Sequence, residues 1–209
     1  MKLLITAATE KELQIAKGLF NQHDTHFLCT GVGMVNTTFT LSQHLSAYCP
    51  DLVLNIGIAG AIDHEIKIGD VFLVEKDEFA WFGSESPEGF IPFNMSGTFD
   101  AQQTVDNSFH FQLKSFESYF DDYIRTNAIT VQTVTGTAES VERLKKHYSA
   151  GIESMEGAAF YYVCQALANA YVQLRAVSNH VEERKKSNWK IDEALEQLRH
   201  SLIMLSKEL

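Results

Sequence analysis

The sequence predicts a single-domain α/β protein with three layers, in which a central, mostly parallel mixed sheet lies between two layers of helices. Short apolar segments with strand character alternate along the chain with segments of helical periodicity. This alternation is typical of parallel strands joined by helices. The chain has 209 residues and shows neither an internal repeat nor a boundary between domains. Residues 1–209 are therefore expected to form one domain around one core.

The first quarter of the chain predicts two units, each a strand followed by a helix. Residues 3–7 are apolar and predict a buried strand, and a helix is expected over residues 10–20 with Thr9 as its cap. A second strand is expected over residues 26–30 and a second helix over residues 36–48. Strand followed by helix is the order that a parallel sheet requires, because parallel strands need long crossover connections.

The middle of the chain is predicted to hold two further strands and a long loop. Buried strands are expected over residues 52–56 and 71–74, with a glycine-rich turn over residues 57–60 between them. Residues 79–93 are rich in aromatic side chains, which predicts a wall of the ligand pocket, a contact with a second subunit, or plain core packing. Residues 94–107 are polar and aperiodic, so they are expected to form a loop.

The last third of the chain predicts two more strands and two more helices. Strands are expected over residues 129–134 and 172–177, and a mostly buried helix over residues 154–168. Residues 191–205 predict an amphipathic helix with its apolar residues on one face. Ligands of open α/β sheets bind at the carboxyl ends of the strands, so the segments that follow the strands are where functional residues are expected.

The charge and the hydropathy of the chain exclude two classes of partner. The chain carries 17 Lys and Arg against 27 Asp and Glu, a formal net charge of −10. A nucleic-acid binder needs a basic face, and the one dense basic cluster, Arg184-Lys185-Lys186, is typical of a solvated loop. No apolar run reaches the roughly 18 residues that a membrane span needs. Neither a nucleic acid nor a membrane is therefore expected as a partner.

Neither a metal nor a cofactor is expected. The three cysteines, Cys29, Cys49 and Cys164, have no zinc-site spacing, and their odd number indicates a reducing compartment and predicts a cytoplasmic protein. No His-Glu-x-x-His motif is present among the eight histidines. Gly31-Val32-Gly33 begins like a dinucleotide-binding loop, but Asn36 stands where the third glycine belongs.

Two motifs in the last third of the chain carry most of the functional information. Residues 152–159, Ile-Glu-Ser-Met-Glu-Gly-Ala-Ala, place two acids where a strand meets an alanine-rich helix. Acidic residues favour a helix N-terminus, which explains one acid but not a Met-Glu pair before so apolar a helix. Residues 175–179, Arg-Ala-Val-Ser-Asn, follow at the end of another predicted strand.

Read together, these motifs resemble the Met-Glu signature and the Arg-x-x-Ser-Asp/Asn strand end of the purine nucleoside phosphorylase and nucleosidase superfamily. Four upstream segments also stand where that superfamily places its ribose and base loops. They are Glu10-Lys11-Glu12, Gly31-Val32-Gly33, residues 55–60 and Thr135-Gly136-Thr137. The resemblance covers nearly the whole chain and implies a nucleoside phosphorylase-like fold, a small-molecule nucleoside as substrate, and a homodimer or a higher homo-oligomer.

The chemistry of N-glycosidic bond cleavage assigns roles to the matching residues. Positive charge grows on the sugar and negative charge on the departing base, so a carboxylate near the sugar and a general base for water accelerate the reaction. Glu156 is expected to accept both ribose hydroxyl protons, with Met155 against the sugar. Glu12 is expected to be the general base. Arg175 is expected to orient the water or to neutralise the acids, and to pair with a carboxylate because it is buried.

The remaining candidates are expected to bind the nucleoside, and Asn179 is the most informative of them. The resemblance places Ala59, Gly60, Thr137 and Ser178 in the base and ribose loops. Nucleosidases for adenosine-type substrates carry Asp where this chain has Asn179. An amide can donate to O6 of a 6-oxopurine and accept from N7–H, so Asn179 favours hypoxanthine or guanine over adenine.

Water is favoured over phosphate as the nucleophile. Related phosphorylases hold phosphate with arginines from the N-terminal half of the chain, but the first arginine here is Arg125. Residues 178–184, together with Trp189, are similar to the futalosine hydrolase branch of the superfamily, which implies release of hypoxanthine from futalosine in menaquinone biosynthesis. Three alternatives remain: a methylthioadenosine/S-adenosylhomocysteine nucleosidase, a phosphorylase for inosine or guanosine, and a catalytically silent nucleoside-binding protein.

Overall fold

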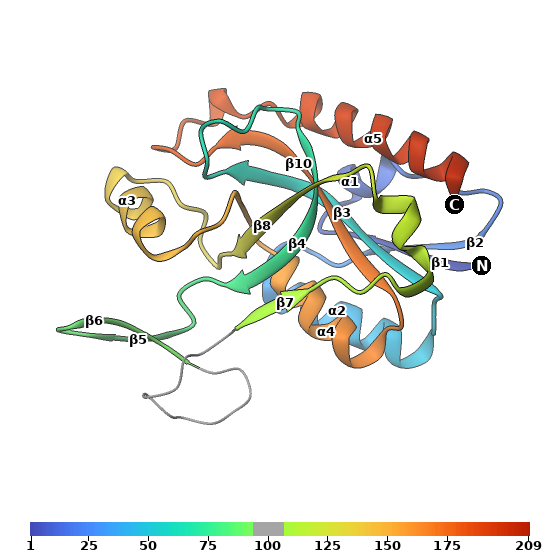
Figure 1. Cartoon of the computed structure of the whole chain (residues 1–209), viewed down its shortest axis with the longest axis horizontal. Helices are drawn as coiled ribbons and strands as arrows, with labels where there is room; N and C mark the ends of the chain where they lie inside the picture. The colour runs from blue at the N-terminus through green and yellow to red at the C-terminus, as the bar shows by residue number, and fades with distance from the viewer. Residues whose placement is uncertain (94–106) are drawn as a thin grey trace.

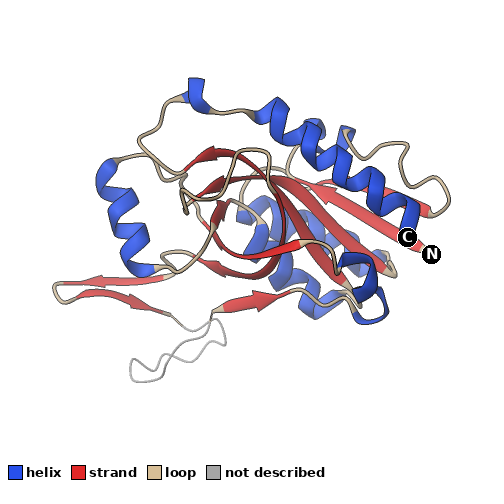
Figure 2. Cartoon of the chain, turned by 45° about the horizontal axis from the view of Figure 1, so that its top comes forward, coloured by secondary structure: helices blue, strands red, loops and turns tan. Residues whose placement is uncertain are grey.

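The computed structural model describes residues 1–93 and 107–209, and it has the three layers that the sequence predicts. A twisted mixed sheet lies between helices on both of its faces (Figures 1 and 2). The expected loop over residues 94–107 falls outside the described residues except for Asn107. The α/β class, with mostly parallel pairing in the central sheet, is confirmed.

The central sheet has eight strands in the order β10-β4-β8-β9-β3-β1-β2, with β7 paired to β4. The strands are β1 (Lys2–Ala7), β2 (Asp24–Cys29), β3 (Leu52–Ala61), β4 (Val71–Phe79), β7 (Ser108–His110), β8 (Ile124–Thr130), β9 (Ile152–Ser154) and β10 (Tyr171–His180). Strand β3 pairs with β1 and then β9 along one edge, and with β10 along the other. Because β10 also pairs with β4, five strands close into a ring from which β1 and β2 extend.

Helices form one layer on each face of the sheet. The α-helices are α1 (Glu10–Gln14), α2 (Met34–Ala47), α3 (Ala138–His147), α4 (Gly157–Leu167) and α5 (Ile191–Glu208), and two 3-10 helices span Lys114–Phe120 and Lys186–Asn188. Helices α1 and α5 lie above the sheet in Figure 1, and α2 and α4 lie below it. Two apolar clusters fill the spaces between the layers, one under α5 and one against α2 and α4.

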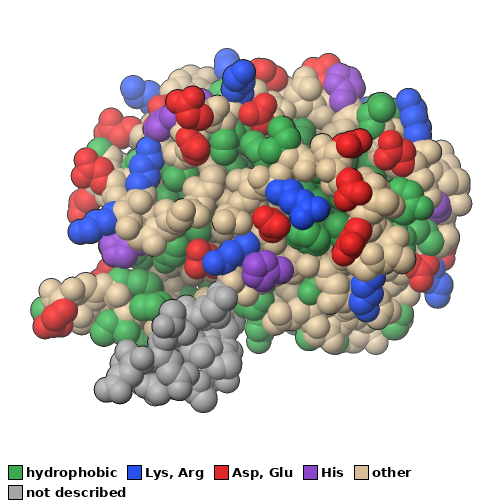
Figure 3. Space-filling model, in the orientation of Figure 1, with side chains coloured by type: hydrophobic (Ala, Val, Ile, Leu, Met, Phe, Trp, Pro, Cys, Tyr) green, Lys and Arg blue, Asp and Glu red, His purple; other side chains and the backbone are tan. Residues whose placement is uncertain are grey.

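The amphipathic helix predicted over residues 191–205 is confirmed as α5. Its buried residues follow helical spacing and pack on the apolar face of the sheet. They are Ala194, Leu195, Leu198, Leu202 and Leu205. Within the described residues, none of the helices combines the length and the apolar character that crossing a bilayer requires. On the face shown in Figure 3, acidic and basic side chains are interspersed.

Several predicted boundaries were wrong; β4, for example, continues to Phe79 instead of ending at residue 74. Helix α1 ends at Gln14 instead of continuing to residue 20, and Gly18 then turns the chain at a φ of 81°. Residues 57–60 are not a turn: they continue β3, because β10 and β9 satisfy their backbone groups. The strand expected over residues 129–134 is β8, which ends at Thr130. Residues 152–154 form β9, so α4 begins only at Gly157.

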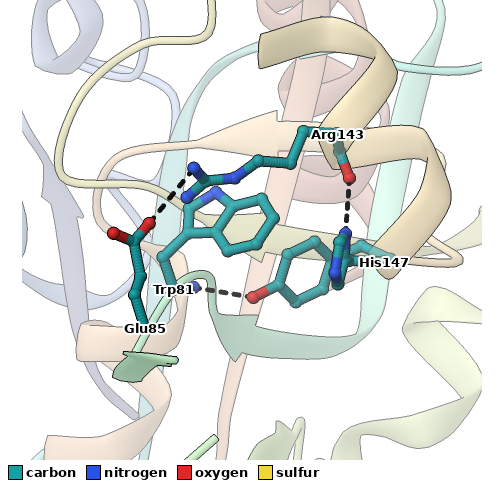
Figure 4. A network of polar contacts seen from close by, with 5 residues as sticks. Trp81, Glu85, Arg143 and His147 are labelled. Atoms are coloured by element: carbon teal, nitrogen blue, oxygen red, sulfur yellow. Dashed lines mark hydrogen bonds and ion pairs between the residues drawn. The ribbon is translucent and has the colours of Figure 1, made fainter. Parts of the chain in front are cut away.

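The aromatic stretch over residues 79–93 forms a hairpin that α3 holds. Strands β5 (Gly83–Ser86) and β6 (Gly89–Pro92) pair with each other and form a separate two-stranded sheet. The Trp81 backbone N–H donates to the Tyr148 hydroxyl at 2.7 Å, and the Arg143 guanidinium carbon lies 4.1 Å from the Trp81 ring centroid (Figure 4). Arg143 also pairs with Glu85 at 3.3 Å. These contacts join the hairpin to one end of α3.

Candidate active site

A cavity of about 380 Å³ opens at the carboxyl ends of the parallel strands β1, β3 and β10. Strand β9 crosses beside it, and helices α1, α4 and α5 complete the wall. Seven of the nine residues predicted from the sequence line it: Glu12, Ala59, Gly60, Met155, Glu156, Ser178 and Asn179. The sheet therefore brings together residues that are far apart along the chain, at the strand ends where ligands of such folds bind.

Glu12 is fixed by hydrogen bonds to both of its carboxylate oxygens. Thr9 caps α1 as predicted, since its hydroxyl accepts from the Glu12 backbone N–H at 3.3 Å. The same hydroxyl donates to Glu12 Oε2 at 2.6 Å, and the Ile58 backbone N–H donates to Oε1 at 3.2 Å. The side chain is 8% exposed and lines the cavity. A carboxylate held this way is aimed at one place in the cavity.

Glu156 stands at the N-terminal end of α4, opposite the loop before α2. The Gly33 backbone N–H donates to Glu156 Oε1 at 2.8 Å, and Gly33 has a φ of 90°, which favours glycine. Burial raises the pKa of Glu156 above its usual range, while the Arg175 charge and the Gly33 N–H lower it. Glu12 raises the pKa of Glu156 further, because the two acids face one cavity.

Arg175 lies directly behind the cavity and is 1% exposed. A Cβ atom at Gly57, which pairs with Arg175 in the sheet, would collide with Arg175 Nη1 and would lie 3.0 Å from Glu12 Oε1. Glycine at this position therefore lets the guanidinium approach the Glu12 carboxylate. Among residues 1–93 and 107–209 the expected direct carboxylate partner is not found: Arg175 Nε donates to Gln173 Oε1 at 3.1 Å, and Nη2 donates to Asn55 Oδ1.

A bulge in β10 turns two successive side chains toward the cavity. Val177 pairs with Ala59 and Asn179 pairs with Gly60, so Ser178 is the extra residue. In a regular strand neighbouring side chains point to opposite faces, but here both Ser178 and Asn179 line the cavity.

The amide of Asn179 is oriented by its neighbours and keeps part of its bonding capacity. Ser178 Oγ donates to Asn179 Oδ1 at 2.8 Å, and Asn179 Nδ2 donates to the His180 carbonyl oxygen at 3.0 Å. An amide oxygen accepts two hydrogen bonds and an amide nitrogen donates two. One acceptor site and one donor proton of Asn179 therefore remain for a ligand.

Thr137 does not line the cavity. Its side chain caps α3, where the hydroxyl accepts from the Ser140 backbone N–H at 3.1 Å. The neighbouring Thr135 instead binds a residue in the cavity wall: its backbone N–H donates to Glu153 Oε1 at 3.0 Å. Burial raises the pKa of Glu153. The lining of this cavity therefore does not support the nucleoside-binding role expected for Thr137.

Several cavity residues received no role from the sequence. Glu153 belonged to the Met-Glu motif and Trp189 to the C-terminal motif, but neither pattern shows that the side chains reach the cavity. The aromatic stretch over residues 79–93 contributes nothing to the lining of this cavity. Among the described residues, no group of three or more His, Cys, Asp or Glu side chains has the arrangement that holds a metal ion.

The arrangement has the parts that cleavage of a glycosidic bond needs. Three buried carboxylates (Glu12, Glu153 and Glu156), one oriented amide and a nearby guanidinium converge on one cavity. Carboxylates stabilise positive charge on a sugar, and the cavity is large enough to bury most of a nucleoside. Its lining is mainly apolar apart from these groups.

Comparison with known proteins agrees with this chemistry. The family model of the phosphorylase superfamily matches residues 5–208. A futalosine hydrolase of Acidothermus cellulolyticus is 29% identical over an alignment 219 residues long, which covers 98% of this chain and 89% of the relative. A 5'-methylthioadenosine/S-adenosylhomocysteine nucleosidase of Buchnera aphidicola is 26% identical over 199 residues, covering 91% of this chain and 83% of the relative.

Solved structures show the same fold. The native structure of futalosine hydrolase from Helicobacter pylori superposes with a TM-score of 0.84 at 16% sequence identity, covering 100% of this chain and 98% of that one. The superfamily predicted from the Met-Glu and Arg-x-x-Ser-Asn motifs is thus confirmed by a match along almost the whole sequence. The chain belongs to the phosphorylase superfamily.

Proposed function

We propose that this chain is an N-glycosidic hydrolase that releases hypoxanthine from futalosine, in the biosynthesis of menaquinone. The observation that carries the proposal is that Glu12, Glu156 and Asn179 line one cavity. The similarity to the Acidothermus futalosine hydrolase along 98% of this chain supports the choice of substrate.

In the proposed mechanism the sugar lies between the two acids. Glu156 accepts hydrogen bonds from the two ribose hydroxyls, and Met155 packs against the ribose ring. Glu12 removes a proton from the attacking water as the bond to the base breaks. The Arg175 guanidinium, behind Gly57, lowers the pKa of Glu156 and so stabilises its ionised form.

Asn179 meets the departing base in this proposal. Its free donor proton binds O6 of hypoxanthine, and its free acceptor site binds the proton that N7 takes up from solvent as the base leaves, while Glu12 returns the proton of the attacking water to solvent. Adenine carries an amino group in place of O6, so two donors would face each other. A buried mismatch of this kind lowers kcat/KM strongly, because polar groups are left unpaired.

Water rather than phosphate is the nucleophile in the proposed reaction. In the described lining of the cavity the one cationic side chain is Lys11, and it already forms an ion pair with Asp192 at 2.6 Å. A phosphate dianion needs several cationic or N–H donors, as arginine forks supply in phosphorylases.

Arg184 is proposed to bind the carboxylate of the 5′ benzoate extension of futalosine. Its guanidinium carbon lies 5.6 Å from the centroid of the Trp189 ring, and Trp189 lines the cavity. Arg184→Gln is expected to raise KM for futalosine while leaving KM for inosine unchanged, because inosine has no acidic 5′ group. Steady-state kinetics with both substrates measures the difference, and equal changes for both would contradict this role.

A substrate panel tests the proposed function. The protein is incubated with futalosine, inosine and methylthioadenosine, each with and without inorganic phosphate, and the released base is measured by chromatography. Hypoxanthine released from futalosine without phosphate is the expected result. Adenine release without hypoxanthine release would overturn the role of Asn179, and strict dependence on phosphate would overturn hydrolysis.

A homodimer or a higher homo-oligomer in the cytoplasm is the proposed assembly. Three apolar side chains, Val32, Val35 and Phe39, are at least half exposed in and before α2, and Val32 also lines the cavity. A second subunit on this face would bury them and close the cavity. Phe39→Glu is expected to shift the mass measured by light scattering to the monomer; an unchanged mass would place the interface elsewhere.

A further inference from the structure

A chain of buried side-chain hydrogen bonds connects Arg175 to a carboxyl group outside the cavity. Gln173 Oε1 accepts from Arg175 Nε at 3.1 Å, and Gln173 Nε2 donates to Asp77 Oδ2 at 3.0 Å. On its other side, Arg175 Nη2 donates to Asn55, whose Nδ2 donates to Thr6 Oγ1 at 2.9 Å. None of these five side chains is more than 1% exposed. A buried network this complete fixes the conformation of each member.

The direction of the hydrogen bonds depends on Asp77. An ionised carboxylate only accepts, so the amide nitrogen of Gln173 must face Asp77. The carbonyl oxygen of Gln173 is then left to face Arg175 Nε, which only donates. Asp77 thus sets the orientation of the Gln173 amide, and that amide holds the guanidinium.

A second arm of the network reaches the start of α4. Thr130 Oγ1 donates to Asp77 Oδ1 at 2.9 Å and accepts from the Ala158 backbone N–H at 2.7 Å. A Cβ atom at Gly157 would collide with Asp77 Oδ2 and Gln173 Oε1. The backbone that carries Glu156 therefore rests directly on the Asp77–Gln173 contact.

We propose that Asp77 is a positioning residue, which holds Arg175 through Gln173 and the start of α4 through Thr130, and thereby sets the geometry of Glu12 and Glu156. Asp77 does not line the cavity and acts only through these side chains. The proposal rests on the role of Arg175 in the proposed function.

Protonation of Asp77 would break the relay. The protonated group must donate one hydrogen bond. A proton on Oδ2 would face the Gln173 NH₂ group, so the amide would reverse and turn that group toward Arg175 Nε–H. Burial raises the pKa of Asp77 to about 7, against the hydrogen bonds from Gln173 and Thr130 and the charge of Arg175. Arg175 from β10 and the Tyr161 phenol from α4 are the titratable groups that interact with it. The relay is therefore intact above neutral pH and is lost below it.

Variants of Asp77 and Gln173 separate the relay from simple packing. In Asp77→Asn the new amide has one oxygen for two donors, Gln173 Nε2 and Thr130 Oγ1, so one of the two bonds can no longer keep its present direction. Gln173→Met removes both bonds of the relay and is expected to lower kcat about 10- to 100-fold with little change in KM, the usual cost of a misplaced catalytic group. The double variant Asp77→Asn/Gln173→Met is expected to be no worse than Gln173→Met, since both changes act on one path.

The combined exchange Asp77→Asn/Gln173→Glu supplies the rescue. Its carboxylate accepts from Arg175 Nε and from the Asn side-chain amide, whose oxygen still accepts from Thr130. Compared with Asp77→Asn alone and Gln173→Glu alone, this exchange is expected to restore most of the lost kcat. Val172→Ala is the control, because Val172 is equally buried on β10 but packs in the opposite apolar cluster.

Kinetics and NMR together decide the outcome. The Arg175 Nε–H signal, assigned with Arg175→Lys, is expected to exchange slowly in the wild type, the control and the exchange variant, and rapidly in Gln173→Met. Wild-type kcat in Gln173→Met, or an exchange variant less active than both single variants, would overturn the proposal. A wild type that releases no base from any nucleoside would refute the proposed function instead, and the NMR experiment would still test the relay.

Discussion

The two faces of β10 differ in what they demand of the sequence. On one face Val172, Leu174 and Ala176 pack in the apolar cluster under α5. On the other face Gln173 and Arg175 are just as buried but lie in a hydrogen-bond network that leads to the cavity. The apolar face needs volume and hydrophobicity, whereas the polar face needs particular donors and acceptors in a particular order.

This difference follows from the energetics of burial. Burying apolar area contributes about 25 cal/mol per Å² and does not depend on direction. Burying an arginine is costly unless its donors are satisfied, so the polar face gives up stability that an apolar face would have supplied. In the structure this network holds Arg175 beside Glu12. Substitutions on the cavity side should therefore change turnover, and those on the α5 side should change stability.

The largest expected effect on the cavity side is that of Glu12→Gln. This variant keeps the size of the side chain but cannot accept the proton of water, and kcat is expected to fall about 10²- to 10⁴-fold, the usual contribution of a general base. Steady-state base release measures the loss. Glu10→Gln is the matched control, because Glu10 lies in the same helical turn but is exposed. Full turnover in Glu12→Gln would contradict the role of Glu12 as general base, and with it the claim that substitutions on the cavity side change turnover.

A smaller effect is expected for Asn179→Asp. The ionised side chain loses the donor that faces O6, so the ratio of kcat/KM for inosine over adenosine is expected to fall about tenfold or more. Competition between the two nucleosides in one reaction measures this ratio directly. An unchanged ratio would mean that base selection lies elsewhere in the cavity, with Glu153 the first residue to test.

On the α5 side, Val172→Ala is expected to affect stability alone. Removing two buried methyl groups lowers the free energy of unfolding by about 1–3 kcal/mol. Urea denaturation measures that change, and the same sample is expected to retain wild-type kcat and KM. A loss of turnover in this variant would show that the two faces of β10 are coupled. The contact that connects them would then have to be found.

Local patterns in the sequence predicted the elements that depend on local chemistry. Thr9 caps α1, and the apolar spacing of α5 matches its buried face. The Met-Glu and Arg-x-x-Ser-Asn motifs identified the superfamily and four of the predicted residues that line the cavity, and the upstream segments of the resemblance gave the other three, Glu12, Ala59 and Gly60. These features need only a helix period, a cap or a motif, all of which lie within short segments.

Features that depend on pairing between distant strands were not predicted. Residues 57–60 have the glycines of a turn, yet they extend β3 because β10 and β9 pair with them. Asp77 stands in a run of charged residues that would suit an exposed strand, but β8 and α4 bury it completely. Thr137 is a miss of another kind, because it matched a base-binding loop in sequence while a local capping box with Ser140 commits its hydroxyl to α3.

A crystal structure of Glu12→Gln soaked with inosine tests the central claim most directly, since the variant should bind the nucleoside without cleaving it. The account predicts ribose hydroxyls on Glu156, the O6 and N7 edge of the base on Asn179, and residue 12 beside the anomeric carbon. Inosine bound with its base away from Asn179, or with its ribose out of reach of Glu156, would contradict the assigned roles of this cavity.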